Sequence, residues 1–253
     1  MRGIDSPCVC HLLEQATDPV FHLEYIPQCD DTLIDDAVDR DAYGKLQSLY
    51  FCVGTNWNVA AAADRTFFKM VGCKAKTVKV TASFNTEYTI AIDFSVKSAV
   101  TATTPEGAAP TALTGNYLAF NVAGAIAKDG GDFAYIVDSI DLTFEHNLTD
   151  KWDHDSLVKQ YCIEGARDID GTIDISLDEG GGVHWGQIMA QTEFDVIVDL
   201  GGTTCPRITL PNCKWKSGEF DINISGDPMM DSAPFTSHPS NSSECSNVVS
   251  ATP

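Results

Sequence analysis

Apolar and polar residues alternate along many short segments of this chain, and this pattern constrains the fold more than any other feature. Apolar side chains occupy every second position from Val78 to Phe84, and the alternation resumes from Tyr88 to Val96 after Asn85-Thr86-Glu87. Because successive side chains of a strand point to opposite faces, a period of two indicates a strand with one buried face. The two runs therefore predict a long hairpin.

The same period appears in four further segments, which are 140–144, 169–177, 194–200 and 220–224. Such alternation is typical of antiparallel sheets in which one face packs and the other meets water or a partner. Two such faces packed together form a sandwich or a barrel-like core. We therefore predict a mainly β fold with two packed antiparallel sheets.

Helices are expected at two places among these strands. Residues 183–191 follow the acidic, glycine-rich run 178–182, and acids ahead of a helix favour its positive N-terminal end. Gly186 weakens this flanking helix, so two or three turns are expected. A second, acidic helix is expected near Leu33 to Val38.

The less regular segments divide the chain. We predict an N-terminal arm over 1–60, a β-domain over 61–236 that contains a long loop at 98–116, and a C-terminal tail over 237–253. The tail is rich in Pro, Ser and Asn, which favours an extended arm over a packed element.

The chain is strongly acidic, with 36 acids against 16 bases and a formal net charge of −20. Counterion release needs clustered Lys and Arg, so this balance argues against specific DNA binding and against anionic membranes. The longest apolar stretch, 117–127, is too short for a bilayer, and the first residues lack the apolar core of a secretory signal. We expect synthesis and assembly in a cytoplasm.

Acids also follow the outer faces of two expected strands. They are Asp168, Asp170, Asp174 and Asp178 on one strand and Glu193, Asp195 and Asp199 on the other. One interpretation is an ordinary solvent face, which a half-buried strand needs anyway. The other is a surface that must not bind phosphate.

Sequence motifs for catalysis or metal binding are weak. The run 39–44 resembles a calcium loop but lacks acids at two ligand positions, and Cys8-Val9-Cys10-His11 lacks a second ligand pair at zinc spacing. The cluster 150–155, with His146 nearby, is interpreted as a solvated turn. We therefore expect no enzyme activity, no cofactor and no metal.

The chain contains nine cysteines at irregular spacings. In a reducing cytosol most should be buried free thiols, and we treat Cys162 as part of the core. A Cys205–Cys213 bridge is the alternative at one place.

Three ordered stretches resemble the tail tube (major tail) proteins of siphovirus-type phages and related archaeal viruses. They are Gly72-Cys73 with the hairpin 76–97, the strands 139–147 and 165–178, and the late run 208–214 followed by Ala233-Pro234-Phe235. The resemblance covers roughly 67–236, with a looser match in 20–60.

The resemblance implies two packed sheets with a flanking helix and subunits that form stacked, hexameric rings in a virion tail. It implies inner strands joined into a barrel around a channel, and rings that stack through the N-terminal arm, the long loop and the C-terminal segment. Genome DNA passes through that channel during ejection, and a tail terminator, a tape measure and a baseplate or distal tail protein are further partners. The acids named above are then candidates for the channel wall, where they would repel phosphates.

Three other readings stay open. The chain could be another ring protein of a virion tail or injection machine, including a terminator, baseplate or contractile-tail tube protein. It could be an acidic β-sandwich adhesin or surface-layer module, or an enzyme that uses the cluster 150–155.

Overall fold

The computed structural model describes fourteen stretches of the chain: 8–13, 18–28, 32–41, 43–55, 66–104, 126–128, 131–132, 136–153, 155, 159–176, 187–200, 207–216, 219–220 and 230–238. Within these residues the architecture is mainly β and antiparallel, as predicted. Among them, no helix is long and apolar enough to cross a membrane.

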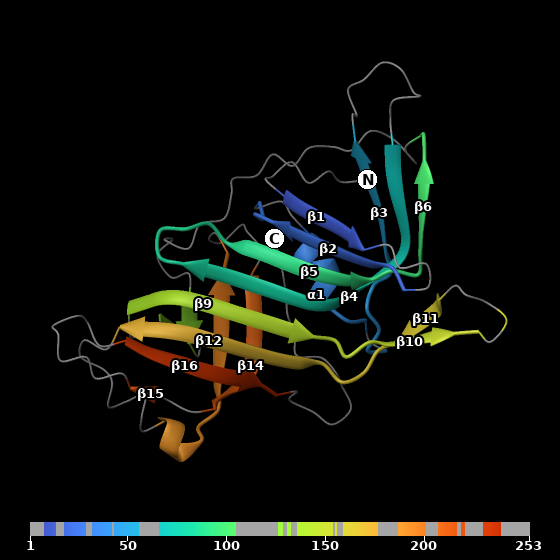
Figure 1. The fold of residues 1–253 in the computed structure, drawn as a ribbon. Coiled ribbons are helices and arrows are strands. Elements are labelled where there is room, and N and C mark those ends of the chain that lie inside the picture. Colours follow the sequence, from blue (N-terminus) through green and yellow to red (C-terminus); the bar gives the residue numbers. More distant parts are fainter. Residues whose placement is uncertain are drawn as a thin grey trace.

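Long strands form one layer of the molecule, called here the long layer (Figure 1). In spatial order it consists of β1 (Cys8–Leu13), β2 (Val20–Tyr25), β5 (Thr89–Ser95), β4 (Thr66–Ser83), β9 (Ile136–Glu145), β12 (Asp168–Ser176) and β16 (Met230–Ser237). The short strand β15 (Glu219–Phe220) pairs with β16. The hairpin predicted from the two alternating runs is confirmed as β4 and β5.

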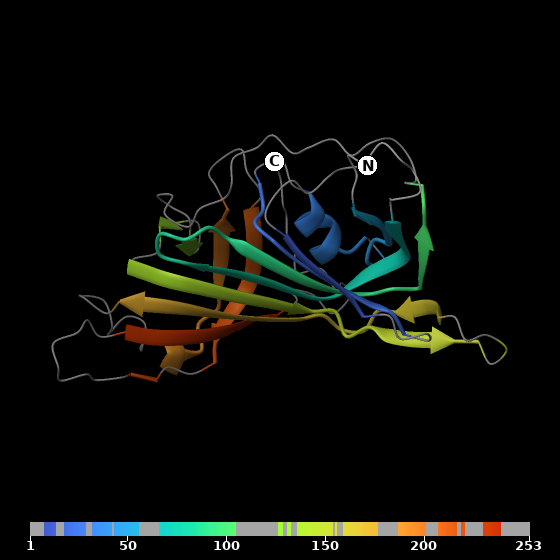
Figure 2. The same ribbon diagram turned by 45° about the horizontal axis from the view of Figure 1, so that its top comes forward.

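The sheet then continues into a second layer without a break. The β14 strand (Arg207–Trp215) pairs with the end of β16, and β13 (Phe194–Asp199), β7 (Ile126–Lys128) and β8 (Gly131–Asp132) follow. The two packed layers are therefore parts of one curled 14-stranded sheet. Figure 2 shows β13, β14 and helix α1 (Leu33–Val38) on the same side of the long layer.

A single apolar core lies between these layers. Its fully buried side chains include Val78 and Ile140 from the long layer, Val196 and Leu210 from the second layer, and Ile34 from α1. The burial follows the alternation seen in sequence, so the local pattern decides which face of each strand is covered. The helix predicted near Leu33 to Val38 is confirmed.

The first part of β4 leaves the long layer and forms a smaller extension. It pairs with β3 (Leu49–Thr55) on one side and with β6 (Ser98–Ala102) on the other. Gly72 adopts φ +69°, and a Cβ there would lie 2.8 Å from the Lys97 Cβ, so glycine is required where β4 bends. We call this unit the β3–β4–β6 extension.

A separate hairpin, β10 (Thr149–Trp152) with β11 (Lys159–Ile163), lies at the same end of the molecule as the extension (Figures 1 and 2). This result corrects the interpretation of 150–155 as a solvated turn, since Asp150 to Trp152 are strand residues. The polar composition of this segment gave no strand signal, and its pairing partner, β11, follows about ten residues later in the chain.

The predicted segment boundaries need revision. Residues 98–102 of the expected loop are a strand, and 105–116 lie outside the described residues. Within 1–60, β2, α1 and β3 pair or pack with the long strands, so the β-domain begins before residue 61. Residues 187–190 of the expected flanking helix are helical, whereas 183–186 and the tail after His238 are outside the described residues.

Candidate channel surface

Strand β12 carries three of the predicted channel acids on one face. Its residues Ile169, Ile173 and Ile175 are fully buried in the core, which turns the alternate positions to the opposite side. Asp168 and Asp170 are exposed there and Asp174 is half-buried. Asp178 lies outside the described residues.

The strand pairing extends this face across the long layer. Asp168 on β12 is aligned with Glu145 on β9, Thr77 on β4, Asp93 on β5 and His22 on β2. Parallel rows start from Asp170, Thr172 and Asp174. Together the rows carry seven carboxylates, which we call the acidic face: Glu24, Asp93, Asp141, Glu145, Asp168, Asp170 and Asp174.

Positive side chains on this face are fewer than the carboxylates. Lys79 Nζ lies 2.8 Å from Asp141 Oδ2, and Lys216 Nζ lies 2.5 Å from Asp170 Oδ1. His22 Nδ1 lies 2.6 Å from Asp93 Oδ1. The remaining residues of the rows are mostly Ser and Thr, so the surface is polar with an excess of negative charge.

The β13 acids occupy a different surface and a different electrostatic setting. Their strand belongs to the second layer, and its apolar residues Val196 and Val198 enter the shared core. Three interactions with β14 satisfy the acids: Glu193 with Lys214 at 3.0 Å, Asp199 with Arg207 at 2.7 Å, and Asp195 Oδ1 accepting from the Asn212 N–H at 3.0 Å. Asp195 and Asp199 are thereby separated from the β12 acids. Glu193 lies nearer to them, because its partner Lys214 is aligned through Thr236 with Asp170.

Comparison with known families favours one of the interpretations left open by the sequence. The family model described as phage tail tube protein matches residues 37–185, which is more than half of the chain. The chain belongs to the phage tail tube protein family. A comparison with curated proteins found no match. The matched residues run from the end of α1 through β12 and include most of the acidic face.

Membership of this family makes the chain a structural component of the virion tail. A tail tube protein functions by self-assembly together with other tail proteins. The relevant sites are therefore surfaces, and the geometry of the sheet faces and ends matters more than that of any pocket.

The β10–β11 hairpin is fixed to the long layer by a buried ionic cluster. Lys159, whose side chain is fully buried, lies 2.8 Å from both Asp18 Oδ1 and Asp150 Oδ2 and donates to Ser95 Oγ at 2.6 Å. The Cys162 thiol donates to Asp150 Oδ1 at 2.9 Å. Ser95 Oγ also donates to Asp150 Oδ1 at 2.9 Å, so Asp150 accepts from three neighbouring groups.

The cluster shifts the protonation equilibria of its members. Burial raises the pKa of Asp150, but hydrogen bonds from Cys162, Lys159 and Ser95 outweigh it, and the pKa falls below its usual value. Burial lowers the pKa of Lys159, and its two carboxylate partners more than reverse that effect. Burial, followed by the contact with Asp150, raises the pKa of Cys162, which keeps the thiol protonated. The arrangement is that of a structural ion pair and not of an activated nucleophile.

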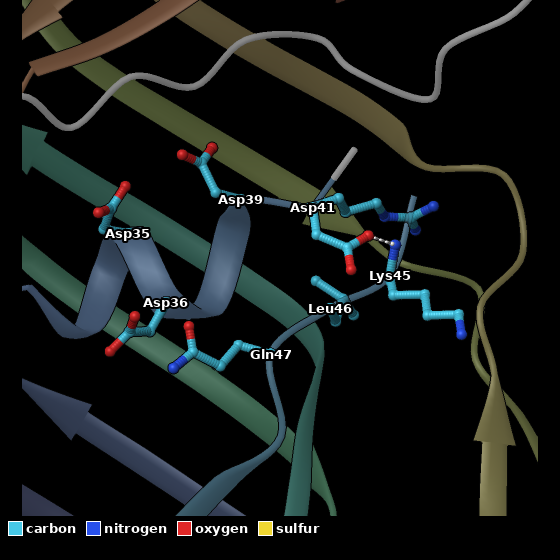
Figure 3. A pocket seen from close by; sticks show the side chains of 8 residues that line it. Asp35, Asp36, Asp39, Asp41, Lys45, Leu46 and Gln47 are labelled. Atoms are coloured by element: carbon cyan, nitrogen blue, oxygen red, sulfur yellow. Dashed lines mark hydrogen bonds between the residues drawn. The ribbon is translucent and has the colours of Figure 1, made fainter. Parts of the chain in front are cut away.

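Acids also line a pocket of about 390 Å³ beside α1 (Figure 3). Burial, followed by a hydrogen bond with Asp35, raises the pKa of Asp39 to about 7. Asp41, part of the calcium-loop look-alike, accepts from the N–H groups of Tyr43 and Lys45 and so closes a local turn. Among the described residues, no group of three or more His, Cys, Asp or Glu is placed to hold a metal ion.

His146, which the sequence grouped with residues 150–155, belongs instead to the core beneath α1. Its Nε2 lies 3.1 Å from the Ala37 carbonyl oxygen, and burial together with Arg40 and Arg167 lowers its pKa to about 3. Arg167 donates to the Val38 carbonyl oxygen at 2.8 Å, so these groups attach the C-terminal end of α1 to the β9–β12 region. The histidine is therefore a neutral structural residue.

The thiols whose side chains the structure describes are buried or half-buried. Cys73 and Cys162 are buried free thiols and Cys52 is a half-buried one, in agreement with the expectation for a reducing cytosol. The Cys213 thiol is buried and donates to the Leu210 carbonyl oxygen at 3.3 Å. Cys205 lies outside the described residues, as do the side chains of Cys8, Cys10 and His11.

Sequence reasoning missed four members of the acidic face. Asp141 and Glu145 alternate with the apolar residues of β9, and that signal was available in the sequence. Glu24 and Asp93 could be found only from the pairing of β2 with β5, which joins residues about 70 positions apart.

Proposed function

We propose that this protein forms the tube of a virion tail, with the acidic face turned toward the channel. Six subunits would close a ring, and rings would stack into a hollow tube through which genome DNA passes during ejection. Assembly would occur in the host cytoplasm, and the ends of the tube would contact a terminator, a tape measure and a baseplate or distal tail protein. The role is structural, without catalysis.

The acidic face carries the proposal. It spans β2, β5, β4, β9 and β12, the strands that give the molecule its longest continuous sheet. DNA binds where clustered cations release counterions, so a wall with seven carboxylates and few cations lets the duplex slide without being held. The Ser and Thr side chains between the acids keep the channel wall hydrated.

Within the predicted set, Asp168, Asp170 and Asp174 are the candidates for the channel wall, and Glu193, Asp195 and Asp199 are assigned to the other side of the subunit. The support is the location of β12 and β13 in opposite layers over one core. The outer faces of the two layers join at the β14–β16 pairing, beside Glu193, and point away from each other beyond it, so one channel cannot be lined by both along their length.

Contacts between rings are assigned to parts of 1–60 and to the loop of 98–116. Because 98–102 pair with β4 as β6, the deletion that tests the loop is 105–112, which spares the strand. The variant should fold and form short oligomers without long tubes. Tubes of normal length from this variant would exclude the loop from stacking.

Electron microscopy of the purified protein tests the proposal as a whole. Hollow rings or tubes are expected at high protein concentration. A protein that stays monomeric by sedimentation under all assembly conditions would contradict it.

A further inference from the structure

The β10–β11 hairpin exposes three large side chains at one end of the molecule. Trp152, Tyr161 and Ile163 are 47%, 60% and 45% exposed. Both strands belong to a two-stranded sheet of their own, which continues past the end of the long layer (Figures 1 and 2). Apolar groups gathered on a projecting element indicate a contact surface.

The base of this hairpin is unusually well fixed. Lys159 is fully buried between Asp18 and Asp150, and Ser95 of β5 contacts Asp150, Lys159 and Cys162. Removing one partner from a buried ion pair strongly destabilises a protein, because a buried charge is left uncompensated. A change in the hairpin's orientation would separate Lys159 from its carboxylates in the same way, so the hairpin is held in one orientation. A preorganised hairpin loses little conformational entropy when it binds.

The opposite end of the same strands presents a complementary feature. Phe84, in the β4–β5 turn, is 63% exposed. Thr86 fixes the turn by donating its N–H and its hydroxyl to the Ser83 carbonyl oxygen, at 3.0 and 2.7 Å. In Figure 1 this turn and the β10–β11 hairpin lie at opposite ends of the long layer.

Exposed charges of opposite sign lie beside the apolar groups of the two ends. Lys76, Lys97 and Lys151 are exposed at the hairpin end, and none of them forms an ion pair with a described residue. Glu87 is exposed beside Phe84 at the other end. Asp153 and Asp155 are also exposed on the hairpin, so the complementarity is local and pairs Lys151 with Glu87 of another copy.

We infer that the β10–β11 hairpin of one subunit docks on the β4–β5 turn of a second copy in the next ring. Tyr161 and Ile163, which share one face of the hairpin with Lys151, contact Phe84, and Lys151 faces Glu87. A contact between opposite ends of identical subunits is heterologous and repeats without closing, which is the geometry of stacked rings. The inference rests on the proposed tube and adds a stacking element to the loop and the N-terminal segment.

The double variant Tyr161→Asp/Ile163→Asp tests the apolar part of this contact. Both side chains are exposed, so the subunit should fold and form rings. Mean tube length in electron micrographs should fall at least about tenfold, because two buried carboxylates oppose docking. Met189→Asp, another exposed apolar residue but in the 187–190 helix, is the matched control and should leave tube length unchanged.

A charge swap tests the pairing. Lys151→Glu and Glu87→Lys should each shorten tubes, and the two together should restore them. If the double variant shortens tubes as much as the two single changes together, the proposed pairing of Lys151 with Glu87 is wrong. Normal tubes from Tyr161→Asp/Ile163→Asp would overturn the hairpin contact alone, whereas wild-type protein that forms no rings would instead refute the tube itself.

Discussion

Strands β12 and β13 show similar sequence patterns, in which acids occupy the alternate positions except at Thr172 and Ile197, yet the two groups of acids meet different neighbours. The β13 acids face Lys214, Arg207 and a backbone N–H of β14. The β12 acids face β9 and β16, where Asp168 accepts from Asn147 and Asp174 accepts from Ser139, and only Asp170 meets a lysine.

The difference shows that an acidic strand becomes an acidic surface only when its neighbours do not compensate it. On β12 the adjacent rows add Asp141, Glu145 and Asp93, which enlarges the negative region. On β13 the neighbouring strand removes most of the excess charge. A channel wall that repels DNA requires the first arrangement.

The largest expected effect comes from reversing the charge of the two strands. Tubes of Asp168→Lys/Asp170→Lys/Asp174→Lys should retain duplex DNA with an affinity on the order of 100-fold above wild type at 0.1 M salt, because clustered cations release counterions. The retained DNA should resist nuclease, since it lies inside the tube.

The matched control is Glu193→Lys/Asp195→Lys/Asp199→Lys. DNA bound to these tubes should remain open to nuclease digestion. Protection by the β13 variant, or digestion of the DNA held by the β12 variant, would reverse the assignment of the two faces.

Gly171→Ala tests the packing beneath the β12 face. A Cβ at Gly171 would lie 2.2 Å from the Phe235 Cζ and 2.8 Å from the Leu142 Cδ2. The free energy of unfolding should fall by about 2–3 kcal/mol, the upper range for overpacking a core. Denaturant unfolding measures it, and Thr172→Ala, which points to the outer face, should change the value by less than about 1 kcal/mol.

Neutralising each group of acids should change stability in opposite directions. Asp168→Asn/Asp170→Asn/Asp174→Asn should leave the subunit unchanged or raise its free energy of unfolding by up to about 1 kcal/mol at low salt, because repulsion across the rows is relieved. Glu193→Gln/Asp195→Asn/Asp199→Asn should lower it by about 1 kcal/mol, because two ion pairs are lost. A change in the free energy of unfolding with the same sign for both variants would mean that the neighbouring strands do not give the two groups of acids different electrostatic settings.

A smaller effect is expected at the acid pair beside α1. The folded-state pKa of Asp39 is raised from 3.8 to about 7, so the stabilisation from its protonated form is complete below pH 3.8 and is lost as the pH rises through 7. Asp39→Asn should therefore raise stability at pH 8 by about 1 kcal/mol after allowance for solvent screening. Thermal unfolding at pH 5 and 8 measures this, with Asp153→Asn as a control for the loss of one charge.

Much of the fold could be predicted because its signal is local. Alternation identified β4, β5, β9, β12 and β13, and the short acidic helix was found within its bounds. Strand β6 was missed because small and hydroxyl residues in 98–102 give little hydrophobic contrast. The β10–β11 hairpin was missed because its polar residues give no hydrophobic alternation. The carboxylate of Asp150 is compatible with a partly buried strand only because Lys159 neutralises it, and that contact forms only in the fold.

The candidate surface was predicted only in part for a related reason. Sequence periodicity gives the face on which an acid lies, but the register between distant strands decides which acids share a surface. Pairing of β4 with β9 and of β2 with β5 joins the rows of the acidic face, and neither pairing has a local signature.

Electron cryomicroscopy of assembled tubes tests the central claim most directly, because it shows which sheet face surrounds the channel. We predict that Asp168, Asp170 and Asp174 point into the lumen together with Asp141 and Glu145, and that the β13 acids lie on the outer side. A tube in which β13 lines the channel and the β12 face is turned outward would contradict the account.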